Sequence, residues 1–310
     1  MNNIAVLIPC YNEEVTIKKV ILDCKNYLPE ADIYVYDNNS IDESVKISKE
    51  CGVHVRHEYK QGKGNVVRAM FQDIDADCYV IVDADDTYSL NKIKMMCDKV
   101  LLEHVDMVVG DRLSSTYYSE NKRAFHGFGN KLVLRVINKF FNTNISDVMT
   151  GLRCLSFEFV KTFPVLSKGF EVETEMTIHA AYHNMNIENV VIDYKDRPQN
   201  SPSKLNTISD GIKVLKMIFN LFKNYKPMQF FGIISIVLFS ITSIIFASLL
   251  IDFYRSGEVR RFPTLIVCCF VYLTSILSLF TGLILQSFAE KDRRDFEMKL
   301  QIANFLYRHN

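Results

Sequence analysis

Short apolar runs alternate with stretches of helical periodicity over the first 110 residues of the chain. Between the runs, apolar residues recur every three or four positions, which is the period of an amphipathic helix. Strands that alternate with helices predict right-handed crossovers and a mostly parallel sheet. Because ligands of such sheets bind beyond the carboxyl ends of the strands, we expect the loops after the strands to form one site. The runs that predict strands are residues 4–8, 33–36, 53–55, 79–82 and 106–109.

The run at residues 79–82 leads directly into three carboxylates, Asp83, Asp85 and Asp86. Clustered carboxylates repel one another and resist burial, so a buried strand that ends in them is rarely explained by stability alone. The pattern favours a hard cation, Mg²⁺ or Mn²⁺, whose remaining coordination positions can hold a phosphate-bearing ligand. The alternative interpretation is an acidic, solvated turn in which Asp86 is the N-cap of the following helix.

The chain after residue 110 carries a second set of elements. Residues 130–141 have the periodicity of an amphipathic helix, another helix follows, and residues 188–194 favour a strand. The segment after the first of these helices begins with Asp147 and ends with Arg153. Two interpretations of Asp147 stay open: a catalytic or acceptor-site carboxylate, or an N-cap or structural partner of Arg153.

Two uncharged segments, residues 229–251 and 264–289, dominate the C-terminal part of the chain. As helices they would span about 34 and about 39 Å, enough to cross a bilayer. A short turn joins them, so we expect a transmembrane hairpin over residues 228–290. Residues 205–227 combine an apolar stripe with flanking lysines, which is typical of a helix in the membrane interface. Basic residues at the outer ends of the hairpin favour cytoplasmic termini, including a tail at residues 291–310, although arginines in the turn weaken this rule.

Composition limits the classes of protein further. The chain has 310 residues, a formal net charge of zero and 48% hydrophobic residues, which suits a large core and not a basic nucleic-acid binder. None of the eight cysteines forms a Cys-x-x-Cys pair, so we expect no zinc site or disulfide framework and a reduced, cytosolic soluble part. A strand begins almost at the N-terminus, so we expect no cleavable signal peptide. The missing Gly-x-Gly-x-x-Gly and Gly-x-x-x-x-Gly-Lys-Ser/Thr motifs count against Rossmann dehydrogenases and P-loop NTPases.

The ends of the predicted strands carry an ordered set of motifs: Ile8-Pro9-Cys10-Tyr11-Asn12-Glu13-Glu14, Asp37-Asn38-Asn39-Ser40-Ile41-Asp42, Gly62-Lys63-Gly64 and Asp83-Ala84-Asp85. In this order they resemble an inverting family 2 glycosyltransferase with the GT-A fold, an α/β fold with a Rossmann-like, mostly parallel sheet. The resemblance implies that residues 1–204 form the catalytic domain and that Asp85, with Asp83, holds a divalent metal on the diphosphate of a nucleotide sugar. It also implies a donor site formed by Pro9, Tyr11, Asn12, Glu13, Val35, Asp37, Lys63, Asp83 and Ala84.

Two positions depart from the family pattern. Asn39 stands where the family usually has glycine, but asparagine tolerates the left-handed conformation, so we expect the turn to survive. Thr87 stands where the related lipid-phosphate sugar transferases often have glutamine. A metal contact is therefore lost here, or replaced by a hydroxyl or a water molecule.

A second resemblance concerns the acceptor. The segment from Asp147 to Arg153 resembles the Asp-x-x-Ser/Thr-Gly-x-Arg motif of polyprenyl-phosphate glycosyltransferases. Residues 197–206 resemble the arginine-to-Ser-Lys loop of dolichyl-phosphate mannosyltransferase and its bacterial relatives. These likenesses imply a polyprenyl phosphate as the acceptor, with catalytic candidates Asp85, Asp147 and Arg112. The acceptor phosphate is expected to bind to Arg112, Arg123, Arg197 and Lys204.

The sequence therefore predicts inverting, metal-dependent transfer of a hexose from a nucleoside diphosphate sugar, UDP- or GDP-linked with UDP-glucose favoured, to a polyprenyl monophosphate. The product is a polyprenyl-phosphate sugar, the protein lies in the bilayer with its catalytic domain in the cytoplasm, and a homo-oligomer is compatible with the sequence. One alternative is a processive polysaccharide synthase, but its Gln-x-x-Arg-Trp motif needs tryptophan, which this chain lacks. The other is a membrane-anchored scaffold without catalytic activity.

Overall fold

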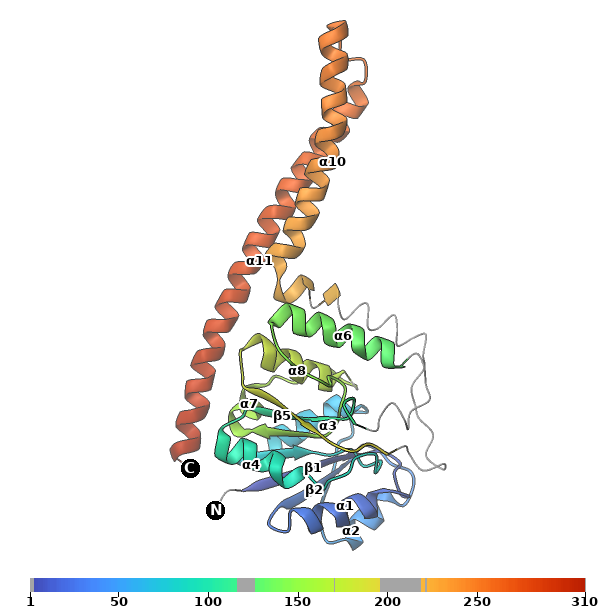
Figure 1. Ribbon diagram of the computed structural model, residues 1–310, viewed down its shortest axis with the longest axis vertical. Coiled ribbons are helices and arrows are strands. Elements are labelled where there is room, and N and C mark those ends of the chain that lie inside the picture. The colour runs from blue at the N-terminus through green and yellow to red at the C-terminus, as the bar shows by residue number, and fades with distance from the viewer. Residues whose placement is uncertain (1–2, 116–125, 170, 196–218, 221, 310) are drawn as a thin grey trace. The chain divides into compact units, whose positions relative to one another are not determined.

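The computed structural model divides into two compact units, Met1–Gly211 with Met298–Asn310, and Ile212–Glu297 (Figure 1). The first unit contains an α/β sheet domain, and the second contains two long apolar helices. The structure describes residues 3–115, 126–169, 171–195, 219–220 and 222–309.

The first unit is built on a seven-stranded sheet in the order β3-β2-β1-β4-β6-β5-β7. β6 runs antiparallel to β4 and to β5, whereas the other described strand pairs are parallel. The expected mostly parallel sheet is therefore confirmed, with one strand reversed. The strands are β1 Ile4–Cys10, β2 Asp32–Asp37, β3 His54–His57, β4 Cys78–Ile81, β5 Met107–Asp111, β6 Arg153–Ser156 and β7 Ile187–Val191.

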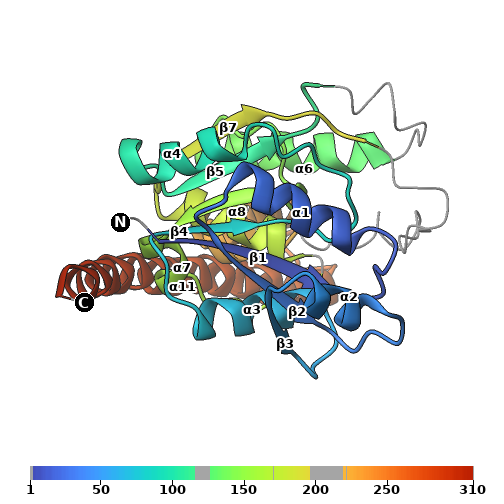
Figure 2. The ribbon, with the colours of Figure 1, turned by 90° about the horizontal axis from the view of Figure 1, so that it is seen from below.

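Helices cover both faces of the sheet, as Figures 1 and 2 show. On one face, α1 and α4 pack against Val6 and Val80, and on the other, α3, α7 and α8 pack against Leu7 and Tyr79. Successive strand residues point to opposite faces, so a sheet covered on both sides needs continuous apolar strands. The helices are α1 Ile17–Tyr27, α2 Ser44–Glu50, α3 Lys63–Asp73, α4 Ile93–Glu103, α6 His126–Phe141, α7 Phe157–Thr162 and α8 Val172–Tyr182.

β1 continues through Pro9, where the sequence predicted its end. Pairing with β4 stops at Leu7, whereas pairing with β2 runs on to Cys10. The carbonyl of Leu7 accepts a hydrogen bond from Val82 on the β4 side, so Pro9, two residues later, turns its nitrogen to the same side, beyond the last β4 pair. A proline at this position therefore removes no hydrogen bond from the sheet.

The sequence did not predict β6 or α7, and it placed the last strand at residues 188–194. β6 has four residues, and only Cys154 and Leu155 between Arg153 and Ser156 are apolar, so it shows no continuous apolar run such as that of β4. β7 ends at Val191, three residues before the predicted end, although the backbone nitrogen of Ile192 still donates to the carbonyl of Asp111. The sheet half that contains β6 was therefore the less predictable one.

The second unit contains α10, Pro227–Ser256, and α11, Phe262–His309, which extends beyond the unit at its C-terminal end. Both are long and apolar enough to cross a membrane, with mean hydropathy of 2.6 and 2.1 in their most apolar windows. Serine hydroxyls join the two helices: the Oγ atoms of Ser235 and Ser275 are 3.1 Å apart, and Ser278 donates to the carbonyl of Phe231 at 3.0 Å. These bonds satisfy polar groups that lipid cannot. Most of the expected helix at residues 205–227 lies outside the described residues.

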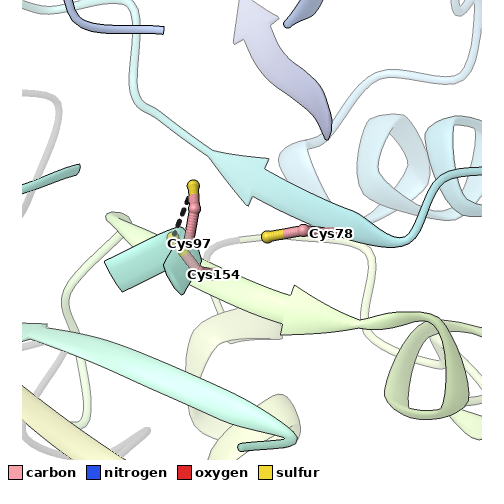
Figure 3. A group of neighbouring side chains, drawn as sticks. All are labelled: Cys78, Cys97 and Cys154. Atoms are coloured by element: carbon pink, nitrogen blue, oxygen red, sulfur yellow. Dashed lines mark hydrogen bonds between the residues drawn. The ribbon is translucent and has the colours of Figure 1, made fainter. Parts of the chain in front are cut away.

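Three cysteines meet in the core between β4, α4 and β6 (Figure 3). The sulfur atoms of Cys78, Cys97 and Cys154 lie within 4.8 Å of one another. A structural zinc site needs four ligands, and no fourth ligand joins this group among the residues that the structure describes. All eight cysteines are free thiols, and these three pack as small apolar side chains of the core.

Candidate active site

The carboxyl ends of β1, β2, β4 and β5 lie at the same edge of the sheet, because these four strands run in one direction. Three buried acids mark the strand ends: Asp37 as the last residue of β2, Asp85 after β4 and Asp111 as the last residue of β5, with 2%, 7% and 2% of their surface exposed. Asp111 accepts hydrogen bonds from the backbone nitrogens of the turn that follows it. Asp37 and Asp85 belong to the predicted donor site, and the sheet brings their strand ends to one edge.

The loops after β1 and β2 interlock. The backbone nitrogen of Asn12 donates to the hydroxyl of Ser40, and the Asn12 side chain accepts from the backbone of Ile41, both at 2.9 Å. Asn12 and Asn39 adopt positive φ angles of 53° and 66°. The expected left-handed turn at Asn39 is therefore confirmed, and Tyr11 next to Asn12 is an exposed aromatic side chain of this edge.

Asp37 is buried below this turn. Its carboxylate accepts from the backbone nitrogen of Ser40 and lies 3.1 Å from Nδ1 of His57. Val35, also predicted for the donor site, has its side chain in the apolar core. Ala84 is buried too, and its carbonyl accepts the hydroxyl of Thr16 at 2.7 Å. Val35 and Ala84 therefore support the site from the interior of the domain, while Asp37 supplies a carboxylate beside it.

Asn38 holds the Gly62-Lys63-Gly64 turn in place. Its amide donates to two backbone carbonyls of the loop after β3, and its oxygen accepts from the nitrogen of Gly62 at 2.7 Å. Gly62 has a φ of +127°, and a Cβ atom there would lie 2.1 Å from the carbonyl oxygen of Lys168. Only glycine fits this close approach, which aims Lys63 at the tip of β4.

Lys63 lies buried between two carboxylates, those of Asp83 and Glu173. Burial alone would lower the pKa of Lys63, but the charges of Asp83 and Glu173 outweigh it and raise this pKa. Burial would likewise raise the pKa of Asp83, but Lys63 first, and then Arg112 and Tyr88, lower it. Lys63 is therefore a fixed cation that keeps Asp83 ionised, and it acts through Asp83 in this structure.

Glu173, on α8, was not predicted as a site residue. Burial raises its pKa, and Lys63 only partly offsets this effect. Its Oε2 atom, like Oγ1 of Thr150, is buried without a hydrogen-bond partner among the described residues. What marks Glu173 in the structure is the burial of α8, in which almost every residue is buried. A helix buried on all sides needs a cation for any acid that it carries.

Tyr88 and Gly151 complete the surroundings of Asp83. Tyr88 donates its hydroxyl to Asp83 Oδ2 at 3.3 Å and accepts the backbone N–H of Gly151 at 2.8 Å. A Cβ atom on Gly151 would lie 2.1 Å from Asp83 Oδ2. The carboxylate of Asp83 therefore rests against a backbone that only glycine can provide.

Asp85 and Asp86, which follow Asp83, have different partners from each other. Asp85 Oδ1 accepts two hydrogen bonds from Thr87, from the backbone nitrogen at 3.2 Å and from the hydroxyl at 2.7 Å. Asp86 has a positive φ of 54° and pairs with Lys19, far from the start of α4 at Ile93, so it is not the N-cap of that helix. The carboxylates of Asp83 and Asp85 provide the hard oxygen ligands that Mg²⁺ and Mn²⁺ prefer, so the residues present fit a divalent metal.

Asp147 is completely buried and forms a two-point ion pair with Arg112, at 2.7 Å from Nε and 3.2 Å from Nη2. The proposed partnership of Asp147 with Arg153 is replaced by this pair. Arg153 instead donates to the carbonyls of Val148 and Thr150, at 2.7 and 3.1 Å. Burial lowers the pKa of Arg153 to about 10. Arg153 therefore shapes the loop of which Asp147 and Gly151 are part.

The remaining acceptor candidates, Arg123, Arg197 and Lys204, lie outside the described residues. Of the residues that the sequence missed, Gly151 and Glu173 act on the tip of β4 from other parts of the fold, whereas Tyr88 lies in the loop after β4 itself.

Acids at the tip of a central strand, with cations beside them, are an arrangement that could hold a divalent metal and an anionic ligand in an α/β enzyme. Residues 5–163 match the family described as glycosyl transferase family 2, so the chain belongs to this family and is a glycosyltransferase. Two relatives from Haloferax volcanii support this: glycosyltransferase AglJ is 30% identical over 74% of this chain and 75% of its own length, and a dolichyl-phosphate hexose transferase is 26% identical over 70% and 92%. The fold is similar to that of glucosyl-3-phosphoglycerate synthase from Mycobacterium tuberculosis, solved with Mn²⁺, UDP and phosphoglyceric acid, with a TM-score of 0.55 and 19% identity over 72% of this chain and 78% of that one.

Proposed function

We propose that this protein transfers a hexose from a nucleoside diphosphate sugar to a polyprenyl monophosphate, with inversion at the sugar carbon. The observation that carries the proposal is the tip of β4, where the carboxylate of Asp83 pairs with Lys63 and feels the charge of Arg112, and where Asp85 follows two residues later. Carboxylates suit a divalent metal, and an arginine suits a phosphate group. A relative that is named a dolichyl-phosphate hexose transferase supports the lipid phosphate as the acceptor.

The donor would lie across the ends of β1, β2 and β4. Asp85 and Asp83 would hold Mg²⁺ or Mn²⁺, which neutralises the charge of the departing diphosphate. Asp37 and the exposed ring of Tyr11 offer a hydrogen-bond acceptor and an aromatic face to the base and ribose. A solved structure of similar fold that contains Mn²⁺ and UDP supports a UDP-linked donor, and the resemblance of the acceptor segments favours UDP-glucose.

The acceptor phosphate needs no strong general base. Its second pKa is about 6 by analogy with phosphorylated side chains, so it is largely ionised at neutral pH. An oxygen of this phosphate forms the new bond to the sugar carbon as the bond to the diphosphate breaks on the opposite side. Asp147 then serves to position Arg112, with which it is paired, and Arg112, Arg123, Arg197 and Lys204 are the proposed phosphate contacts.

The two apolar helices would place this reaction at the membrane, where the lipid acceptor resides. We propose that residues 1–204 form the catalytic domain, that residues 205–227 lie in the interface, and that both termini face the cytoplasm. Basic residues at the outer ends of the two spans support this orientation.

Purified full-length protein in detergent, mixed with radiolabelled UDP-glucose or GDP-mannose and a polyprenyl phosphate, tests the proposal. We expect a labelled, organic-soluble product that needs Mg²⁺ or Mn²⁺. Asp85→Asn should lower its rate by about 100-fold or more. The matched control is Asp86→Asn, whose carboxylate binds Lys19 at the surface and should leave the rate unchanged.

Either of two results would reject the proposed function: no lipid product with any donor, or full activity in Asp85→Asn. A labelled water-soluble polymer in place of the lipid product would instead support the processive synthase.

A further inference from the structure

The chain that leaves β7 returns to the loop after β4. Ser89 donates its backbone N–H to the carbonyl of Asp193 at 3.1 Å, and Lys195 donates to the carbonyl of Thr87 at 3.0 Å. These bonds form a short antiparallel bridge with Tyr88 directly opposite Tyr194. Two segments about a hundred residues apart in sequence are thus joined beside the acids of β4.

Directly opposed residues of an antiparallel pair carry their side chains on the same face. The rings of Tyr88 and Tyr194 therefore form an aromatic platform of two side chains. The guanidinium carbon of Arg112 lies 5.9 Å from the ring centroid of Tyr88 and 5.8 Å from that of Tyr194. Both distances fall within the range of a cation–π interaction.

Arg112 is thus restrained in two ways. The platform supports its guanidinium through the two rings, and the buried carboxylate of Asp147 holds one edge through two hydrogen bonds. The charge of Arg112 also acts on Asp83, since it contributes to the lowered pKa of that carboxylate. An arginine whose direction is fixed in advance binds a phosphate group with a smaller loss of side-chain freedom.

We infer that Tyr194 is a positioning residue of this active site, which fixes Arg112, together with Tyr88, for binding a phosphate group of a substrate. The inference rests on the proposed function, in which Arg112 contacts phosphate. The phosphate belongs either to the diphosphate of the donor or to the acceptor lipid. Tyr194 stands three residues before Arg197, so the same segment leads into the predicted acceptor residues.

Replacement of the ring tests this inference. Tyr194→Phe keeps an aromatic face, whereas Tyr194→Leu removes it at similar bulk. We expect Tyr194→Phe to behave like the wild type and Tyr194→Leu to raise KM about fivefold, which corresponds to a cation–π interaction of about 1 kcal/mol. Separate KM measurements for the nucleotide sugar and the polyprenyl phosphate show which phosphate Arg112 binds. The control is Tyr34→Leu, in β2, whose ring stacks on His54 away from Arg112.

A double-mutant cycle tests whether Tyr194 acts through Arg112. With Arg112→Met in place, adding Tyr194→Leu should change KM no further, because the cation that the ring supports is gone. Three results would overturn the inference: an unchanged KM in Tyr194→Leu, equal damage in Tyr194→Phe, or additive effects in the cycle.

A binding measurement separates this inference from the proposed function. Calorimetric titration of UDP with Mn²⁺ and, separately, of inorganic phosphate into the full chain needs no turnover. If no lipid product forms with any donor, the proposed function fails. The inference still stands if Tyr194→Leu, and not Tyr194→Phe, weakens binding of either anion about fivefold. Equal binding of both anions by Tyr194→Leu and the wild type would reject it.

Discussion

The two halves of the sheet build the candidate site in different ways. In the half formed by β1 to β4, the candidate carboxylates lie at or just beyond the carboxyl ends of their strands: Asp37 is the last residue of β2, and Asp85 comes four residues after the end of β4. In the half formed by β5 to β7, the contributions of Asp147 and Gly151 precede a strand, and Glu173 comes from a helix. Apart from Arg112, which follows β5, the second half mainly holds in place the side chains that the first half presents at its strand ends.

The direction of β6 explains this difference. Arg153 pairs with Ile81 in an antiparallel register, so the residue two positions before Arg153 lies opposite the residue two positions after Ile81. These residues are Gly151 and Asp83, the pair whose close approach leaves no room for a Cβ atom. A reversed strand therefore brings its beginning to the edge where parallel strands end. Such a contribution comes before its strand in the sequence, whereas those of parallel strands come after theirs.

The largest expected effect is that of Gly151→Ala. Its methyl group would lie 2.1 Å from Asp83 Oδ2, and Asp83 cannot retreat without losing its contacts with Lys63 and Tyr88. A displacement of about 1 Å at a reacting site can cost about 100-fold in rate, so we expect a loss of this size in kcat/KM for hexose transfer.

Gly52→Asn is the control for Gly151→Ala. Gly52 has a φ of +68°, which asparagine tolerates, and a Cβ atom there meets nothing within 4 Å. It should keep the wild-type rate. Near-normal kinetics in Gly151→Ala would show that the second half does not hold Asp83 in place.

The next effect is on stability. Arg153→Met should lower the free energy of unfolding by about 2 kcal/mol, because the carbonyls of Val148 and Thr150 lose buried hydrogen bonds. Thermal unfolding of the purified chain measures this. Arg56→Met is the control, since Arg56 forms an exposed ion pair with Asp73 of the kind that contributes at most about 1 kcal/mol. A stable Arg153→Met variant with a raised KM for the acceptor would instead make Arg153 a substrate contact.

The smallest effect is a pH dependence that comes from α8. His179 packs against the rings of Phe159 and Phe163, and burial, with a contribution from His183, lowers its pKa to about 3. The unfolded chain takes up a proton at this residue near pH 6.5, but the folded chain does not until about pH 3. Burying neutral His179 therefore costs no stability above about pH 6.5. Below that, the free energy of unfolding falls as the pH decreases towards 3.

His179→Phe should remove this dependence. Between pH 7 and pH 6 we expect the wild type to lose about 0.7 kcal/mol more unfolding free energy than the variant does. Chemical unfolding at the two pH values measures the difference. Equal losses in the two proteins would mean that His179 has the same pKa in the folded and the unfolded chain.

The sequence was most informative where the residues that make an element and its motif are local. β1 to β4 and the loops after them could be predicted because an apolar run is followed at once by turn formers or acids, as in residues 79–86. β6 could not, because a four-residue strand that starts with Arg153 has no apolar pattern of its own. Glu173 and Tyr194 were missed since their partners lie far away in sequence, and only the folded chain brings them together. Tyr88 lies five residues after Asp83, but its contacts with Gly151 and Tyr194 also arise only in the fold. The pairing of Asp147 with Arg112 was missed for the same reason.

The central claim is that Asp85 at the tip of β4 holds the nucleotide through a divalent metal. Calorimetric titration of UDP into the full-length protein, with and without Mn²⁺, tests it most directly. We predict binding that requires Mn²⁺, that weakens by more than about tenfold in Asp85→Asn, and that is unchanged in Asp86→Asn. UDP binding that is independent of Mn²⁺ or unaffected by Asp85→Asn would contradict the claim.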